Sequence, residues 1–140
     1  MTELQKTRLE YVHRRKEFLN QKTFYLFEKL QIAVFGFVSY VLVLVAMFHD
    51  GDLSQASLLS LTFIADIFLA LFLVIYLLLS VINIRTWREY DLEEGRLLNL
   101  QSDISPKDIF KWFETWLLII AVLEVILFVV LAHVSISAIF

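Results

Sequence analysis

Three long runs of apolar residues dominate the chain, and each is near the roughly 20 residues that a membrane-spanning helix needs. The runs cover residues 32–48, 57–84 and 116–139. The second run is the longest, so we expect it to tilt or to protrude from the bilayer. The only charged or histidine side chains within the runs are Asp66, Glu124 and His133. The pattern predicts an all-α membrane protein with three transmembrane helices.

The polar residues ahead of the first run predict a separate N-terminal domain. Residues 3–30 contain no glycine or proline, so they are expected to form one long amphipathic helix that is continuous with the first span. Residues 31–140 then form a three-span membrane domain. Its second and third spans are connected by a loop over residues 85–115, in which the second helix is expected to continue as a charged helix as far as Gly95. The turn between the first two spans contains Gly51, and either Asp52 or Ser54 is placed to cap the second span.

Positive charge is distributed very unevenly along the chain. All twelve Lys and Arg residues lie in residues 1–30 or 85–111. The excess of Lys and Arg on cytoplasmic loops therefore predicts a cytoplasmic N-terminal helix and a cytoplasmic loop over residues 85–115. The same rule places the turn at Gly51 and the C-terminal Phe140 outside.

Several chemistries are disfavoured by what the chain lacks. It has no cysteine, which excludes disulfides and Cys-ligated metal sites. It also has no phosphate-binding glycine loop, no Ser–His–Asp set and no His group spaced for a metal. We therefore predict that the protein is not an enzyme and that it binds no metal or cofactor.

Asp66 and Glu124 are the candidate residues of an ion path. At about 1.5 Å per residue, both fall near the middle of a bilayer core of about 30 Å. An acid facing lipid there costs at least about 2.5–3.5 kcal/mol, so each should face protein or water. Thr62 and Ser80 share the Asp66 face of the helix. The acids either line a cation or proton path in an oligomer, or form hydrogen bonds across helix interfaces, whereas His133 is interpreted as a polar residue near the outer interface.

A seven-residue repeat marks the N-terminal helix. One register contains only cations and is called the basic column: Arg8, Arg15, Lys22 and Lys29. The register four places earlier is called the aromatic column: Leu4, Tyr11, Phe18 and Tyr25. On a helical wheel the basic column lies between the aromatic column and Val12, Leu19 and Leu26, whereas Glu3, Glu10 and Glu17 lie on the far side. The strict repeat predicts a bundle in which several copies face a common axis.

The basic column suggests an anionic ligand. Stacked Arg and Lys residues beside Tyr11 and Phe18 suit a nucleotide or a single-stranded oligonucleotide, because cations contact phosphates and aromatic rings stack on bases. Two other interpretations remain open, namely pairing with the acids Glu89, Glu93 or Glu94, and contact with anionic lipid headgroups. Lys6 and Lys16 are expected to lie off the apolar arc.

The layout of residues 1–100, a charged helix followed by two close spans and a polar extension, resembles the small membrane effectors of bacterial anti-phage defence. The resemblance concerns layout alone, and the third span departs from the two-span pattern. It implies a multi-pass protein of the bacterial inner membrane that opens pores in response to a nucleotide ligand.

The sequence therefore favours a homo-oligomeric ion channel or pore-forming effector, most simply a tetramer, gated by its N-terminal helical bundle. One alternative is an accessory or immunity-type subunit that binds another membrane protein and uses its buried acids to hold helices together. A small lipid kinase is a weaker alternative, because Asp66 lies too deep in the membrane for that chemistry.

Overall fold

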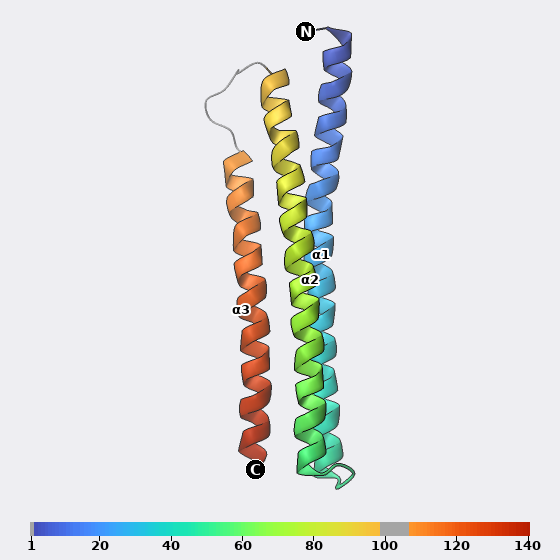
Figure 1. The fold of residues 1–140 in the computed structure, drawn as a ribbon, viewed down its shortest axis with the longest axis vertical. Helices are drawn as coiled ribbons and strands as arrows, with labels where there is room; N and C mark the ends of the chain where they lie inside the picture. The colour runs from blue at the N-terminus through green and yellow to red at the C-terminus, as the bar shows by residue number, and fades with distance from the viewer. Residues whose placement is uncertain (1, 99–106) are drawn as a thin grey trace.

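The structure is a computed structural model of three long α-helices (Figure 1). It describes residues 2–98 and 107–140, and their side chains for residues 2–98 and 114–140. The helices are α1 (Glu3–His49), α2 (Gln55–Leu97) and α3 (Lys107–Ile139). α1 and α2 form an antiparallel hairpin, and α3 runs beside it with its C-terminus near the α1–α2 turn (Figure 1). The all-α fold predicted from the sequence is confirmed.

The ends of α1 and α2 follow from local sequence. α1 begins with a capping box in which the Thr2 side chain accepts a hydrogen bond from the Gln5 N–H and the Gln5 side chain accepts one from the Thr2 N–H. It continues unbroken to His49, as predicted. The chain then turns at Gly51, whose φ of 83° favours glycine. Of the two predicted caps of α2, Ser54 is the one used.

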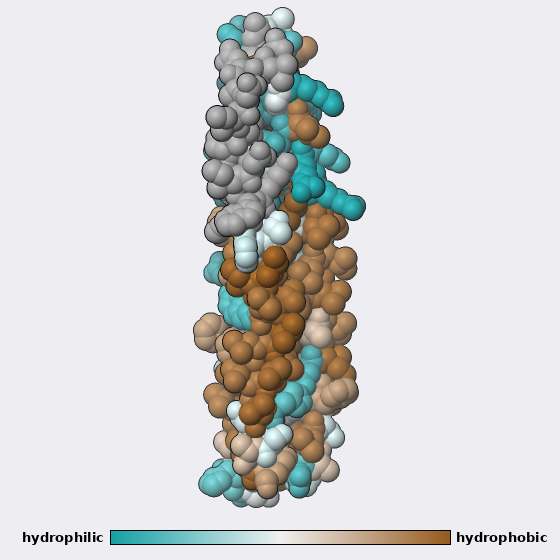
Figure 2. Space-filling view, turned by 90° about the vertical axis from the view of Figure 1, so that its left-hand side faces the viewer, coloured by the Kyte–Doolittle hydropathy of each residue, from teal (hydrophilic) through white to brown (hydrophobic). Residues whose placement is uncertain are grey.

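The helices are much longer than a membrane is thick. At about 1.5 Å per residue, the 47 residues of α1 span about 70 Å, against about 30 Å for a bilayer core. All three helices are long and apolar enough to cross a membrane, judged by length and composition. Figure 2 shows polar residues toward the end where α1 begins, a broad hydrophobic band below them, and some polar residues again at the opposite end.

We call residues 3–30 with 85–98 the charged half, and residues 31–84 with 114–140 the apolar half. In the charged half, α2 continues as a helix to Leu97. The charged helix expected to continue as far as Gly95 is therefore present, and it ends at Leu97. Residues 99–106 lie outside the described part of the chain.

The main hydrophobic core lies in the apolar half and at its boundary with the charged half, where all three helices meet. α3 packs less extensively on α1 and on α2 than these two helices pack on each other. The buried core residues are Leu30, Val34, Phe37, Val41, Leu44, Leu58, Ala65, Leu69, Tyr76, Ala121, Val125 and Ile136. Many large apolar side chains outside this core are exposed on the protomer, as expected for a surface that faces lipid.

Candidate functional site

Asp66 and His133 form a polar pair inside the apolar half. Asp66 belongs to α2 and His133 to α3, and the His133 Nε2 is hydrogen-bonded to the Asp66 Oδ2. The side chain of Asp66 is 15% exposed and that of His133 is 41% exposed. Among the described residues, the second carboxylate oxygen of Asp66 is buried with no hydrogen-bond partner. The pair therefore reaches from the α2–α3 interface to the surface of the protomer.

Glu124, the second acid, also has a partner on another helix. The Gln31 Nε2 of α1 donates a hydrogen bond of 2.6 Å to the Glu124 Oε2 of α3. His133 and Glu124 are nine residues apart on α3, which corresponds to about 14 Å along the helix. The two acids therefore form separate bridges that join α3 to α2 and to α1.

Thr62 and Ser80 lie inside the protomer and not on an open path. Thr62 is fully buried, and its hydroxyl donates to the Leu58 carbonyl of its own helix at 2.8 Å. Ser80 is also buried, and within the described residues its hydroxyl has no hydrogen-bond partner. Asp66 and Ser80 are 14 residues apart, about 21 Å along α2. A single protomer therefore does not bring the four predicted path residues together.

A third polar bridge, which the sequence analysis did not identify, lies near the boundary between the two halves. The Asn83 Nδ2 of α2 donates to the Leu19 carbonyl at 2.8 Å and to the Thr23 hydroxyl at 2.7 Å. The Thr23 hydroxyl of α1 lies 3.4 Å from the Glu114 Oε1 of α3. Asn83, Thr23 and Glu114 are all buried. Polar contacts therefore join the three helices at several levels.

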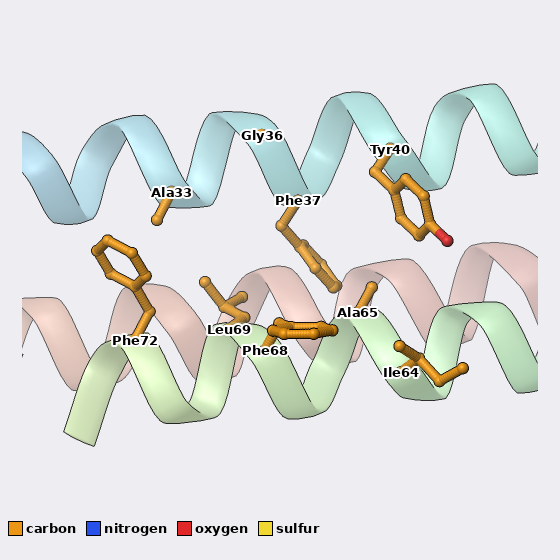
Figure 3. A pocket seen from close by; sticks show the side chains of 9 residues that line it. All are labelled: Ala33, Gly36, Phe37, Tyr40, Ile64, Ala65, Phe68, Leu69 and Phe72. Carbon is orange, nitrogen blue, oxygen red and sulfur yellow. The ribbon is translucent and has the colours of Figure 1, made fainter. Parts of the chain in front are cut away.

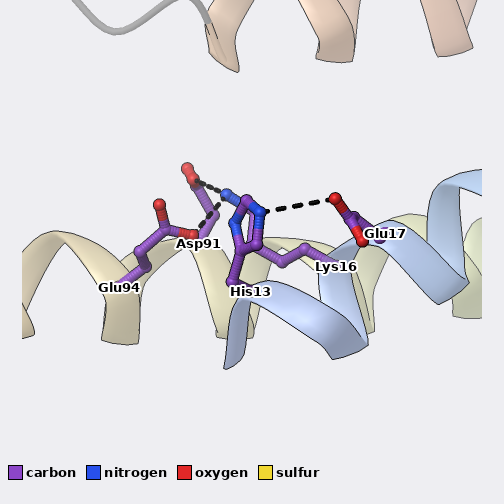
Figure 4. A network of polar contacts seen from close by, with 5 residues as sticks. All are labelled: His13, Lys16, Glu17, Asp91 and Glu94. Atoms are coloured by element: carbon purple, nitrogen blue, oxygen red, sulfur yellow. Dashed lines mark hydrogen bonds and ion pairs between the residues drawn. The ribbon is translucent and has the colours of Figure 1, made fainter. Parts of the chain in front are cut away.

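The charged half contains a buried ion cluster around Lys16 (Figure 4). The Lys16 Nζ of α1 donates to the Asp91 Oδ1 at 2.8 Å and to the Glu94 Oε2 at 3.0 Å. It also lies 4.7 Å from the centroid of the Trp87 ring. The side chains of Lys16, Asp91 and Glu94 are 9%, 16% and 11% exposed. We call this group the Lys16 cluster.

Lys16 was expected to lie off the apolar arc of the N-terminal helix, but its side chain is buried against α2. α2 packs on the side of α1 that carries Val12 and Leu19, and this contact extends around α1 to Lys16 and Thr23. The rotation places the Lys16 ammonium group against two carboxylates of α2, which offset the cost of burying it.

The cations of the basic column have different surroundings. Arg8 makes a two-pronged ion pair with Glu93 of α2, with its Nη2 3.0 Å from the Glu93 Oε2. The Arg15 guanidinium lies 5.3 Å from the Phe18 ring centroid, and the Lys29 Nζ lies 5.0 Å from that of Tyr25. Lys22 is exposed. Pairing with an acid of α2, one of the interpretations left open by the sequence, therefore occurs at Arg8.

We expect the Arg8–Glu93 bridge to weaken in acid. The hydrogen bond from Arg8 lowers the pKa of Glu93 below its ordinary value of 4.5. The bridge therefore stabilises the first turns of α1 above pH 4.5, and this stabilisation is lost as the pH falls through the lowered pKa. Hydrogen exchange of residues 3–12, corrected for its intrinsic pH dependence, should report the loss. The Glu93→Gln variant should not show this acid transition, and an identical transition in both proteins would contradict the assignment.

The aromatic column is the exposed edge of α1. Tyr11, Phe18 and Tyr25 are 45%, 52% and 55% exposed, whereas Val12 and Leu19 on the opposite edge are buried against α2. The apolar arc predicted for the N-terminal helix is therefore divided, since α2 covers one edge and leaves the other largely exposed. At that exposed edge, the Tyr11 ring lies edge-on to the Tyr90 ring of α2, with 6.4 Å between the ring centroids.

An apolar groove of about 450 Å³ lies between α1 and α2 in the apolar half (Figure 3). Small residues, including Ala33, Gly36 and Ala65, leave space between aromatic side chains, including Phe68 and Phe72. The Tyr40 hydroxyl is the only polar side-chain atom among its lining residues. The groove is therefore suited to apolar groups, in keeping with a position inside a membrane.

The described residues contain no group of three or more His, Cys, Asp or Glu side chains placed to hold a metal ion. Comparison with known proteins gave no match to a protein-family model, to a curated protein or to a solved structure.

Proposed function

We propose that the protein is a cation channel formed by several copies of the chain, with an ion path that passes the Asp66–His133 pair. The observation that carries this proposal is the exposure of His133 on the surface of the apolar half while it is bonded to an acid within the same half. Ionisable side chains in membrane-spanning segments face a bundle interior or a water-filled cavity in most membrane proteins. A neighbouring copy would supply such an interior.

The charge of the pair supports a preference for cations. When His133 is neutral, its Nε2–H is donated to the carboxylate and the pair retains one negative charge. Several copies around an axis would then form a ring of carboxylates, which is a common way to select cations. Within the described part of one protomer the predicted path residues are not brought together, so the proposal requires an assembly, for which we favour a tetramer.

The charged half supports a gate on the cytoplasmic side of the bacterial inner membrane. α1 runs as one helix from the basic column into the apolar half without a break, so a ligand that shifts the N-terminal segment would also move the span. Lys22 and Lys29 are exposed beside exposed aromatic rings, an arrangement suited to a nucleotide or oligonucleotide. Binding through phosphates would weaken linearly with the logarithm of salt concentration.

The test is ion flux through the purified protein in liposomes, measured with an ion-sensitive dye, together with the mass of the assembly in nanodiscs. We expect cation flux that rises with the amount of protein, and a mass of several copies. Addition of cyclic nucleotides and short oligonucleotides over a salt series tests the gate, with Lys6→Ala as a control outside the basic column. A monomer, or no flux in any condition, would show that the channel proposal is wrong.

A second candidate function is supported by the partners of the two acids. Because Asp66 bonds to His133 and Glu124 bonds to Gln31, each acid also acts as a link between helices. Such links fit an accessory or immunity-type subunit that binds another membrane protein and does not conduct. This function would give no flux from the purified chain and a fixed stoichiometry with its partner in pull-downs from native membranes.

A further inference from the structure

The exposed surface of α1 in the charged half carries a third column with the same seven-residue spacing. This acidic column consists of Glu3, Glu10 and Glu17, all exposed. α2 covers the side of α1 that carries Val12, Lys16, Leu19 and Thr23. Among the three columns, the aromatic column lies between the basic and the acidic column on the uncovered circumference of α1. A central apolar column flanked by oppositely charged columns is the order found in helices that pack side by side in bundles.

Membrane insertion fixes the direction of such contacts. Copies of one chain cross a membrane with the same topology, so the N-terminal segments of neighbouring copies are parallel. In parallel helical bundles, charged columns that flank the central seam meet the oppositely placed column of the next helix, and opposite charges there set partner choice and orientation. In such pairs, a residue of one helix faces the residue five places further along the next helix.

The spacing between the acidic and basic columns fits this register. Arg15 lies five residues after Glu10, and Lys22 lies five residues after Glu17. The same shift relates Glu3 to Arg8, although Arg8 is already bonded to Glu93 of its own chain. Among the residues whose side chains are described, Glu10 lies 3.9 Å from Arg14 and Glu17 lies 3.4 Å from His13, each one turn away on the exposed surface of α1. Both carboxylates are therefore accessible to a second copy.

We propose that the aromatic column is the seam through which α1 binds a parallel second copy of the chain, in a register set by pairs of Glu10 with Arg15 and of Glu17 with Lys22 between copies. The inference deepens the proposed function, on which it rests for the assembly of several copies. In this arrangement Arg15 and Lys22 face the next copy, so the inference replaces the nucleotide contact proposed above for Lys22 and keeps the assembly of several copies.

The composition of the seam fits association within a membrane. The column next to the aromatic one consists of Thr7, Arg14, Gln21 and Glu28, so aromatic and polar residues alternate along the contact. Such a seam is weaker than one formed by leucine alone. It is sufficient for chains that the bilayer already holds side by side, because association within one membrane avoids much of the entropy cost of bringing free molecules together.

Disulfide crosslinking in membranes tests the seam, because the natural chain has no cysteine. Single Tyr11→Cys or Phe18→Cys variants should form disulfide dimers in most of the protein under mild oxidation. His13 is exposed on the far side of the helix, so the control variant His13→Cys should form at least about fivefold less disulfide dimer. Disulfides require Cβ atoms about 3.5–4.5 Å apart, so the readout is local. Equal crosslinking at Tyr11, Phe18 and His13 would overturn the proposal.

Charge reversal tests the register. In the Phe18→Cys background, Glu10→Lys with Glu17→Lys should reduce crosslinking at least about fivefold, and adding Arg15→Glu with Lys22→Glu should restore it. Exposed Lys6 and Arg88 provide the control, because Lys6→Glu with Arg88→Glu reverses as much charge outside the three columns. The register would be overturned if the variant with all four charges reversed did not regain crosslinking. It would also be overturned if the control variant lost as much crosslinking as the variant with Glu10→Lys and Glu17→Lys. Crosslinking without ion flux would count against the channel alone, whereas flux without crosslinking would count against this seam alone.

Discussion

Replacing Lys16 with methionine is expected to open the charged half. Methionine retains much of the buried volume of lysine but removes the ammonium group that contacts Asp91 and Glu94. Removing one partner of a buried ion pair costs about 3–5 kcal/mol, because the remaining charges stay buried without compensation. Amide hydrogen exchange of residues 8–20 should become faster by about a hundredfold or more, while exchange in the apolar half should change little.

Arg14 provides a matched control for this prediction. It lies two residues from Lys16, but its side chain is 79% exposed and its Nη2 is 3.9 Å from Glu10 Oε2. Exposed pairs of this kind contribute little, so Arg14→Met should leave exchange nearly unchanged. Adding Asp91→Asn and Glu94→Gln to Lys16→Met should recover part of the loss, because no buried charge then remains unpaired. Similar exchange in the Lys16→Met and Arg14→Met variants would show that the Lys16 cluster does not hold the hairpin together.

The sequence was sufficient to predict the helices because their signals are local. Each signal depends only on neighbouring residues in the sequence. These signals are the long apolar runs, the absence of glycine and proline in residues 3–30, and the turn residue Gly51. Even the choice of cap for α2 was narrowed to Asp52 and Ser54. Only the geometry of the turn decides between them, since Ser54 is the residue whose hydroxyl accepts from the Ser57 N–H, at 3.2 Å.

The partners of the polar residues could not be predicted in the same way. They depend on how the helices are rotated and how deeply they lie relative to one another, and hydrophobic periodicity does not determine either quantity to within one residue. Lys16, which the helical wheel places off the apolar arc, lies in a buried cluster because the contact with α2 extends around α1 as far as this residue. The contact between His133 and Asp66 could have been suspected from the positions of the two residues along their helices. It lies six residues from the end of α3 and Asp66 lies eleven from the start of α2, which places both in the same end of an antiparallel bundle.

Replacing Asp66 with asparagine is expected to reduce cation flux by about 30-fold. An ion that passes about 8 Å from the carboxylate gains about 2 kcal/mol at an effective dielectric constant of about 20, and 2 kcal/mol corresponds to about 30-fold in rate. The asparagine side chain can still accept the hydrogen bond from His133, so the α2–α3 contact should persist. Liposome flux measures the effect, and Asp52→Asn, the same change in the exposed turn, should leave flux unaltered. Flux that is unchanged by Asp66→Asn would contradict an ion path at this residue.

A comparison of Asp66→Asn with Asp66→Leu separates the charge of Asp66 from its hydrogen bond. Leucine removes both, and a hydrogen bond between membrane helices contributes about 0.6 kcal/mol on average and up to about 1.7 kcal/mol. If the charge attracts ions, both variants lose flux, and Asp66→Asn keeps its assembly mass. If Asp66 acts only as a link between helices, Asp66→Asn behaves like the natural protein and Asp66→Leu alone loosens α3. The second result would favour the accessory subunit over the channel, because the acid would then serve packing and not conduction.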